Sequence, residues 1–361
     1  MKQAKVLVCP LDWGLGHATR CIPVIRYLMA KGAHVVVAAD GPQLALLRSE
    51  FQDAEFITFP GYGIKYSKTI PAALKLIADI PGILFRIRQE NRLLSDIISR
   101  HSINMVISDN RYGLYNSVVF SVIITHQVNI IPPCFFSAFS GLLHKITGKM
   151  ISRFDECWIP DFEGEHNLSG KLSHGHLLPV NIKYAGILSR FESPYTVVTP
   201  RKYEMIAIVS GPEPQRSIFE ERLLAQLPIN EKHVLLIRGI PGNTDIKPLR
   251  KYVDVADHLP SGVLENILRS SPLVISRAGY STLMDLSRTG NKALLVPTPG
   301  QTEQEYLAGY MAEKGIFYGV QQKKLNLKED IPRALQMSGI VFNNLPGQFT
   351  TLIDNALNNL K

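Results

Sequence analysis

Several features that would place this chain in a specialised class are absent. It has only four cysteines, at positions 9, 21, 134 and 157, and none has CxxC spacing, so we expect reduced thiols and no disulfide framework. No run approaches the ~18 consecutive apolar residues of a spanning helix. The first residues lead directly into an apolar strand, so no signal peptide is expected. These absences favour a cytoplasmic protein that is soluble or lies on a membrane face.

Nucleic acid is also not expected as a partner, because the sequence has no dense Lys/Arg cluster and no recognisable reading motif. The formal net charge of +8 is moderate and favours smaller anionic partners, such as phosphates or lipid headgroups. With 45% hydrophobic and 19% charged residues, the composition is that of a globular protein. The 361 residues indicate two domains, because single cores rarely grow beyond about 250–300 residues.

The first chemical signal is a glycine turn between a strand and a helix. An apolar strand over residues 5–9 is followed by PLDWGLGHATR and a helix over residues 19–31. Gly14 and Gly16 allow a tight turn close to a ligand, and His17 at the helix entrance can remove a proton near neutral pH. The alternative is that His17 only caps the helix.

Acidic and imidazole side chains follow later strands of the same half. Strands are expected over residues 55–59, 104–108 and 119–125, and the last two lead to Asp109 and His126. In a parallel sheet these residues project from the same edge as His17, where Asp109 can orient it or bind substrate hydroxyls; alternatively, Asp109 caps the next segment. A nicotinamide cofactor is disfavoured without GxGxxG, although Asp40 follows the second strand.

Two stretches, residues 70–100 and 130–153, combine apolar and basic residues. Such segments suit an anionic bilayer surface, or they are internal helices with solvated basic faces.

A polar loop that follows in the sequence contains three histidines and two glutamates, namely His166, His174, His176, Glu163 and Glu165. Without HExxH or DxD patterns, a metal site is the weaker interpretation.

The second half, after a Pro/Ser/Thr-rich linker at residues 189–201, alternates strands and helices again. The turn SGPEPQR places Ser210, Gly211 and Arg216 at a helix N-terminus, which favours phosphate. Residues 275–310 contain two further polar strand-to-helix turns. Because open α/β sheets bind ligands at the carboxyl edge of their strands, these turns predict a ligand site there.

At this point the sequence resembles a known family. SRAGYSTLMD followed by PTPGQTEQEYLA resembles the C-terminal module of MurG-like glycosyltransferases (family 28), and DWGLGHATR resembles their N-terminal turn. The resemblance implies a GT-B fold, with two Rossmann-like domains facing across a cleft. Residues 1–187 would bind the acceptor and residues 188–340 the sugar nucleotide. A helix over residues 341–361 would pack back on the first domain.

The resemblance also implies roles for individual residues. His17 matches the histidine of the acceptor side, with Gly14, Gly16 and His126 nearby, and the support of His17 by Asp109 is carried over more loosely. The expected donor contacts are Asp285 at the ribose, Gln304 and Glu305 at the sugar, His258 near the base, and Ser210, Gly211, Arg216, Gly279, Ser281 and Thr282 at the diphosphate. Asp285 replaces a glutamate, Glu305 a glutamine and Ala308 an asparagine of the family, so some donor contacts must differ.

The resulting hypothesis is a metal-independent, inverting glycosyltransferase without a cofactor. It would move a hexose or N-acetylhexosamine from a UDP-sugar to a hydroxyl of a glycan or lipid-linked acceptor, at the inner face of the cytoplasmic membrane. His17 would be the base. The alternatives are a UDP-sugar epimerase or hydrolase of the same fold, and a non-catalytic sugar-nucleotide-binding protein at the membrane.

Overall fold

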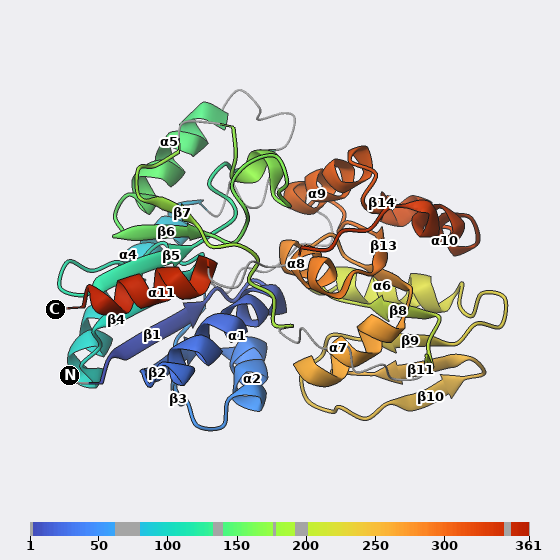
Figure 1. Cartoon of the computed structure of the whole chain (residues 1–361), viewed down its shortest axis with the longest axis horizontal. Helices are drawn as coiled ribbons and strands as arrows, with labels where there is room; N and C mark the ends of the chain where they lie inside the picture. The colour runs from blue at the N-terminus through green and yellow to red at the C-terminus, as the bar shows by residue number, and fades with distance from the viewer. Residues whose placement is uncertain are drawn as a thin grey trace. The chain divides into compact units, whose positions relative to one another are not determined.

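A computed structural model describes residues 3–61, 80–132, 140–175, 178–191, 201–342 and 348–360. The chain divides into two compact units. Their boundary falls between Leu188 and Ser189, and the residues from Asn344 onward belong to the first unit again. Each unit is built around one sheet with helices packed against it (Figure 1). The α/β class expected from the sequence is confirmed.

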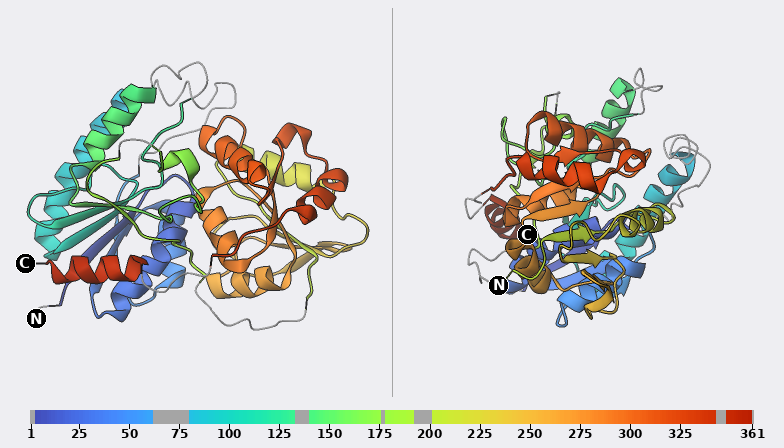
Figure 2. Two further views of the ribbon diagram at one scale, coloured as in Figure 1. Left: turned by 45° about the horizontal axis from the view of Figure 1, so that its top comes forward. Right: turned by 90° about the vertical axis from the view of Figure 1, so that its right-hand side faces the viewer.

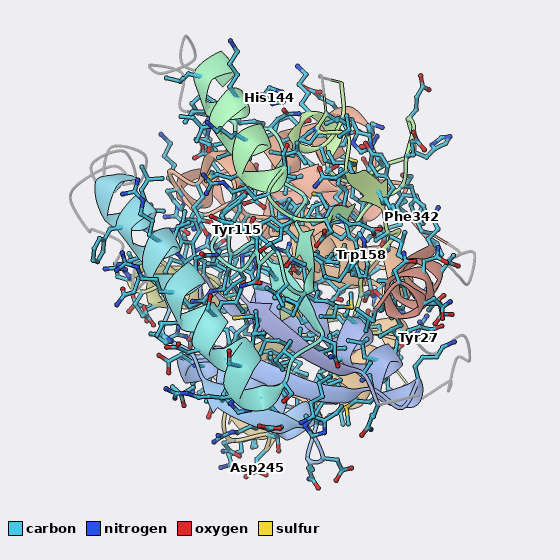
Figure 3. The ribbon with its side chains drawn as sticks, turned by 90° about the vertical axis from the view of Figure 1, so that its left-hand side faces the viewer. Tyr27, Tyr115, His144, Trp158, Asp245 and Phe342 are labelled. Carbon is cyan, nitrogen blue, oxygen red and sulfur yellow. The ribbon has the colours of Figure 1, made fainter. Side chains whose placement is uncertain are left out.

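The sheet of the first unit has seven strands in the order β3-β2-β1-β4-β5-β6-β7, and every neighbouring pair is parallel. Its strands are β1 (Lys5–Pro10), β2 (His34–Ala39), β3 (Glu55–Thr58), β4 (Met105–Asp109), β5 (Phe120–Ile124), β6 (Glu156–Ile159) and β7 (Ile182–Tyr184). The central strands are short apolar runs because helices cover both of their faces. Trp158 of β6, for example, is fully buried (Figure 3).

The helices of this unit are α1 (Leu15–Ala30), α2 (Gly41–Glu50), α4 (Ile80–His101), α5 (Ser140–Ile151) and α11 (Gln348–Asn358), with a 3₁₀ turn η2 (Gly170–Leu172). Helices α4 and α5 lie beside one another (Figure 2). The last helix, α11, packs against α1. There the Tyr27 hydroxyl donates to Asp354 at 2.9 Å, and the Tyr27 ring meets Phe349 edge to face.

The second unit has a seven-stranded sheet in the order β10-β11-β9-β8-β12-β13-β14. Only the pairing of β10 with β11 is antiparallel among the described strands of this sheet. The strands are β8 (Met205–Ile208), β9 (Val234–Ile237), β10 (Lys247–Arg250), β11 (Val253–Ala256), β12 (Leu273–Ser276), β13 (Lys292–Leu295) and β14 (Tyr318–Gly319). The β10–β11 hairpin was not expected from the sequence. Its outer strand is exposed along its whole length, so it lacks the apolar run that marks the other strands.

The helices of the second unit are α6 (Gln215–Leu224), α7 (Ser261–Ser270), α8 (Tyr280–Thr289), α9 (Thr302–Glu313) and α10 (Leu327–Gln336), with a 3₁₀ turn η3 (Gln322–Lys324). Helices α6, α8 and α9 follow the parallel strands β8, β12 and β13. Their N-termini therefore start from the same edge of the sheet, and the three polar turns singled out in the sequence lie along that edge.

Candidate active site and donor-binding turns

Helix α1 begins directly after a glycine turn. Gly14, its N-cap residue, has a φ of 87°, a conformation that residues with a side chain rarely adopt. The helix starts at Leu15 and not at Thr19, the start expected from the sequence, so Gly16 and His17 lie in its first turn. First-turn N–H groups lack an intrahelical partner and carry the positive end of the helix dipole. This end of α1 therefore favours a group that develops negative charge.

His17 contacts the carboxylate of Asp109, the last residue of β4. Nδ1 of His17 lies 2.6 Å from Oδ1 of Asp109. The Asp109 side chain is fully buried, and the His17 side chain is 14% exposed. So short a contact with an ionised carboxylate needs a proton on Nδ1. In the neutral ring Nε2 then has no proton and can accept one.

Arg20 is a member of this cluster that the sequence analysis missed. Its Nε and Nη2 atoms donate to the two oxygens of Asp109, the second at 2.7 Å. Nη2 also lies 2.8 Å from Nδ1 of His17, because both nitrogens contact the same atom, Oδ1 of Asp109. The Arg20 side chain is 1% exposed. Arg20 follows His17 by three residues on one helix face, and this spacing in GHATR is the signal that could have identified it.

His126, which follows β5, belongs to the same cluster. Nη1 of Arg20 lies 2.9 Å from Nδ1 of His126. Because a guanidinium can only donate, Nδ1 of His126 accepts, and the neutral ring carries its proton on Nε2. The structure thus brings together His17, Asp109 and His126 from three elements, with Arg20 between them.

The charge state of Asp109 follows from these neighbours. Burial opposes ionisation, but the Arg20 guanidinium and His17 outweigh it and hold the pKa of Asp109 below its ordinary value. The carboxylate oxygens are engaged by side chains, so helix capping does not explain Asp109. By contrast, Asp40 does cap a helix, because its side chain accepts from the Gly41 N–H at the start of α2.

In the second unit, the turn after β8 contains Ser210 and Gly211 and leads into α6. Gly211 has a φ of 108°, which suits glycine. Arg216, expected at the diphosphate, is bonded to carboxylates of its own unit, with Nε 2.7 Å from Glu213 and Nη1 3.0 Å from Glu220. The structure therefore places its charge in a local ion-pair cluster.

The turn after β12 leads into α8, with Gly279 as the N-cap residue and Ser281 and Thr282 in the first turn. Asp285 lies one turn further and is buried. Ser189 Oγ donates to its Oδ1 at 2.6 Å and Arg190 Nε to its Oδ2 at 3.1 Å. Burial raises the pKa of Asp285, and Arg190 opposes this shift. The backbone N–H of Arg190 also bonds to this carboxylate. A carboxylate has about four acceptor positions, so these three contacts leave some acceptor capacity.

Gln304 and Glu305 lie in the first turns of α9 and contact the loop that precedes it. Oε1 of Gln304 accepts from the N–H of Thr298 at 2.8 Å, and Oε1 of Glu305 accepts from the N–H of Gly300 at 3.0 Å. Both side chains thereby fix the PTPG loop. His258 follows β11 and is 8% exposed. Its backbone N–H donates to the carbonyl of Asn243 at 3.2 Å.

Arg277, directly after β12, is the second arginine that the sequence analysis did not single out. Its side chain stacks on Phe219, with 4.1 Å from Cζ to the ring centroid. It donates to three backbone carbonyls, those of Gln215 at 2.8 Å, Val296 at 3.2 Å and Pro297 at 3.4 Å. Burial lowers the pKa of Arg277 to about 10, so the guanidinium remains charged at neutral pH.

The histidine-rich loop shows structural contacts. Nδ1 of His174 lies 3.2 Å from the hydroxyls of Ser169 and Ser173, and Nε2 lies 3.0 Å from the carbonyl of Phe162. His176 is outside the described residues, as are residues 70–79 and 133–139 of the apolar-basic segments. Within the described ranges, no group of three or more His, Cys, Asp or Glu side chains is placed to hold a metal ion.

Known sequences resemble this chain. Residues 223–340 match the glycosyltransferase family 28 C-terminal domain. An uncharacterized glycosyltransferase of Methanosarcina mazei is 24% identical over 336 residues, which cover 86% of this chain and 84% of the relative. One from Methanosarcina acetivorans is 25% identical over 356 residues, which cover 91% and 86%.

Solved structures show the same fold. MurG of Acinetobacter baumannii matches with a TM-score of 0.54 at 12% identity, and the match covers 99% of this chain and 99% of that chain. The calicheamicin glycosyltransferase CalG4 has a TM-score of 0.60 at 12% identity, with coverage of 100% of this chain and 94% of that chain. A glycosyltransferase of Arabidopsis thaliana, solved with UDP-L-rhamnose, has a TM-score of 0.59 at 15% identity, with coverage of 100% and 95%.

The fold is therefore that of the GT-B glycosyltransferases. The protein is a glycosyltransferase with the fold of MurG, and its residues 223–340 match the glycosyltransferase family 28 C-terminal domain. The family resemblance drawn from SRAGYSTLMD and PTPGQTEQEYLA is confirmed.

Proposed function

We propose that the protein transfers a hexose or N-acetylhexosamine from a UDP-sugar to an acceptor hydroxyl, with inversion at the anomeric carbon and without a metal ion. The observation that carries this proposal is the cluster of His17, Asp109 and Arg20. A buried, ionised carboxylate holds a proton on Nδ1 of His17, and the opposite ring nitrogen is thereby suited to act as a general base.

In the proposed reaction, Nε2 of His17 takes the proton of the acceptor hydroxyl as its oxygen bonds to the anomeric carbon. The bond between that carbon and the diphosphate oxygen breaks, and its electron pair leaves with UDP. Charge that develops on the diphosphate is stabilised by N–H groups at helix N-termini. The turns that start α6 and α8, with Gly211 and Gly279, are suited to this role.

The remaining donor contacts stay part of the proposal. Asp285 would accept from the ribose hydroxyls with its remaining acceptor positions, Gln304 and Glu305 would contact the sugar, and His258 would lie near the base. A UDP-sugar is favoured because the glycosyltransferase of Arabidopsis thaliana with this fold was solved with UDP-L-rhamnose.

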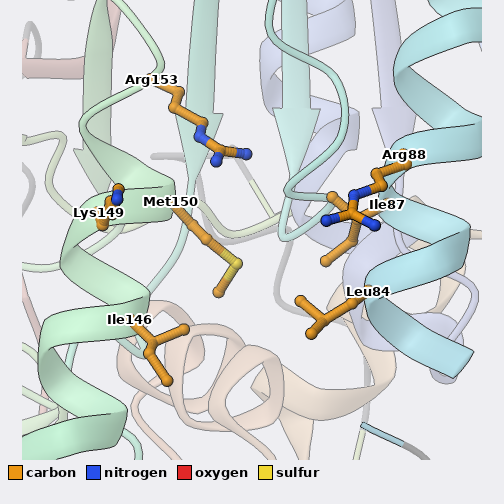
Figure 4. A pocket seen from close by; sticks show the side chains of 7 residues that line it. All are labelled: Leu84, Ile87, Arg88, Ile146, Lys149, Met150 and Arg153. Carbon is orange, nitrogen blue, oxygen red and sulfur yellow. The ribbon is translucent and has the colours of Figure 1, made fainter. Parts of the chain in front are cut away.

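For the acceptor, we infer a lipid-linked hydroxyl compound at an anionic membrane surface. Helices α4 and α5 line a hollow of about 210 Å³ with apolar and basic side chains (Figure 4). The lining residues are Leu84, Ile87, Arg88, Ile146, Lys149, Met150 and Arg153. Leu84 and Ile146 are 44% and 43% exposed. Apolar side chains beside three cationic ones suit acyl chains below phosphate headgroups.

Membrane contact can be tested with vesicles. No helix among the described residues is both long and apolar enough to cross a bilayer. We expect co-sedimentation with phosphatidylglycerol vesicles, weaker binding to phosphatidylcholine vesicles, and a clear loss of binding in Leu84→Glu. The control is Val263→Glu on α7, because Val263 is 45% exposed and lies outside the hollow between α4 and α5. If wild type and Leu84→Glu bind phosphatidylglycerol vesicles equally, the hollow between α4 and α5 is refuted as the membrane contact.

The enzymatic proposal is tested by a thermal-shift screen over nucleoside diphosphates and their sugars, followed by turnover with the donor found. UDP release that depends on an acceptor and falls strongly in His17→Ala, while UDP still binds, supports the transferase. Release of free sugar and UDP without an acceptor would favour a hydrolase, and an isomerised sugar nucleotide an epimerase. Full turnover of His17→Ala would refute the base assignment. EDTA should leave turnover unchanged.

A further inference from the structure

Three buried polar atoms near the carboxyl edge of the second sheet have no hydrogen-bond partner among the described residues. They are Oγ of Ser276, Nε of Arg277 and Oγ1 of Thr298, and each of these residues is about 1% exposed. A buried polar group without a partner destabilises the folded protein. Such groups are therefore rare, and a set of them at a turn expected to bind a ligand indicates that a ligand supplies the partner.

Arg277 connects two segments of this edge, the start of α6 and the loop after β13. One nitrogen, Nη2, donates to the carbonyl of Gln215, the first residue of α6. The other, Nη1, lies within hydrogen-bond distance of the carbonyls of Val296 and Pro297, in the loop after β13. Since Phe219 supports the guanidinium from one side, a single rigid, planar group ties the start of α6 to the PTPG loop.

The peptide group between Pro297 and Thr298 is held at both of its ends. Arg277 donates to the carbonyl oxygen of Pro297, and the N–H of that peptide, which belongs to Thr298, donates to Oε1 of Gln304. Both ends of the Pro297–Thr298 peptide are therefore fixed, and with them the position of the Thr298 side chain. A methyl group added to Gly211 would lie 3.7 Å from Oγ1 of Thr298, so this hydroxyl faces the turn that leads into α6.

We propose that Thr298 donates its hydroxyl proton to an anionic oxygen of the bound nucleoside diphosphate, and that Arg277 is the positioning residue that holds Thr298 beside Gly211. The inference rests on the proposed function, because it takes the donor as its ligand. The turn after β8 and the ten-residue helix α6 supply backbone N–H groups at the same place. Arg216 is paired with Glu213 and Glu220. The buried hydroxyl of Thr298 therefore gives this site a directional hydrogen-bond donor.

The direct test is UDP binding, measured by calorimetry, to Thr298→Val and Thr298→Ser. Valine keeps the shape and removes the hydroxyl, so the free protein should unfold at the same temperature as wild type or higher. UDP should bind about 10–100-fold more weakly to Thr298→Val, the effect of one hydrogen bond to a charged group. Thr298→Ser should bind UDP like the wild type. Unchanged affinity in Thr298→Val would overturn the contact.

The positioning role is tested with Arg277→Lys and its control Arg250→Lys. Arg250 also donates to two backbone carbonyls, those of Leu224 and Leu227, but at the other end of α6. Both variants should lose stability, because a lysine cannot reach several carbonyls at once. Only Arg277→Lys should raise the KM for the donor and weaken UDP binding, with the KM for the acceptor unchanged.

The outcomes separate the two levels of the proposal. If the wild-type protein binds no nucleoside diphosphate or sugar nucleotide, the proposed function fails. If the wild type binds UDP and Arg277→Lys binds it equally well, the function stands and the positioning role is refuted. If Arg277→Lys and Arg250→Lys weaken UDP binding to the same extent, the effect is one of general stability, which also refutes the positioning role.

Discussion

Replacing Asp109 by Asn removes two effects that the buried carboxylate combines. Arg20, 1% exposed, loses the charge that neutralises it, and removal of one partner of a buried ion pair costs about 3–5 kcal/mol. His17 loses the carboxylate that keeps a proton on Nδ1, and loss of an oriented general base lowers turnover by about 10²–10⁴-fold. We therefore expect Asp109→Asn to be both less stable and nearly inactive.

A double variant distinguishes the two effects. In Arg20→Met/Asp109→Leu both charges are replaced by apolar side chains, a change that is often neutral for buried pairs. Its urea midpoint should recover most of the loss seen in Asp109→Asn, whereas UDP release, measured at a temperature where all variants are folded, should stay low. Stability and activity should thus respond differently to the second substitution.

The assignment fails if Asp109→Asn, shown by circular dichroism to be folded, releases UDP at the wild-type rate. It also fails if the apolar double variant regains turnover, because the role of Asp109 would then be structural alone. A second comparison uses His17→Ala/Asp109→Asn. Residues that act as a unit are not additive, so this combination should be no slower than His17→Ala alone.

Three further predictions concern stability. Gly113→Ala should lower the free energy of unfolding, measured by urea denaturation, by about 1–3 kcal/mol, because a methyl group there would lie 2.4 Å from the carbonyl of Ile87 and 2.7 Å from the Glu90 side chain; an unchanged free energy of unfolding would contradict this packing. Ile353→Ala on α11, where the side chain is fully buried, should cost about 2–5 kcal/mol, and a much smaller loss in thermal unfolding would mean that α11 is dispensable. Because the pKa of Asp109 is lowered in the folded protein, its contribution is complete above about pH 4, the pKa of an unfolded Asp. That contribution is lost as the pH falls through the folded value, so acid titrations should show a smaller loss in Arg20→Met/Asp109→Leu than in wild type.

Much of the fold could be predicted from the sequence, because each parallel strand is a short apolar run that ends in polar residues. The runs around Val36, Ile107 and Ile275 gave strands at the expected places. The hairpin of β10 and β11 could not be predicted, because exposed edge residues such as Lys247 and Arg250 carry no apolar pattern. The start of α1 was placed four residues late, because a glycine with positive φ can begin a helix without a capping side chain.

The candidate site was predictable in part for a similar reason. Strand ends identify which residues reach one edge, and His17, Asp109 and His126 do meet there. The spacing of His17 and Arg20 places both on one helix face, but their shared partner Asp109 is 89 residues away from Arg20 in the sequence, and this tertiary contact was missed. The pairing of Arg216 with Glu213 and Glu220 was also missed, although their i,i+3 and i,i+4 spacings are a local signal in the sequence.

The return of α11 to the first unit has a consequence for how the protein is made. A ribosome makes β1 and α1 before the second unit, and α11 only after every described strand of the second unit. The surface of α1 that contacts Phe349 on α11 therefore stays exposed until α11 has been made. The unit that carries His17 is therefore completed only after the second unit has been made. Premature termination within the second unit would leave the first unit without α11 and with this face of α1 exposed.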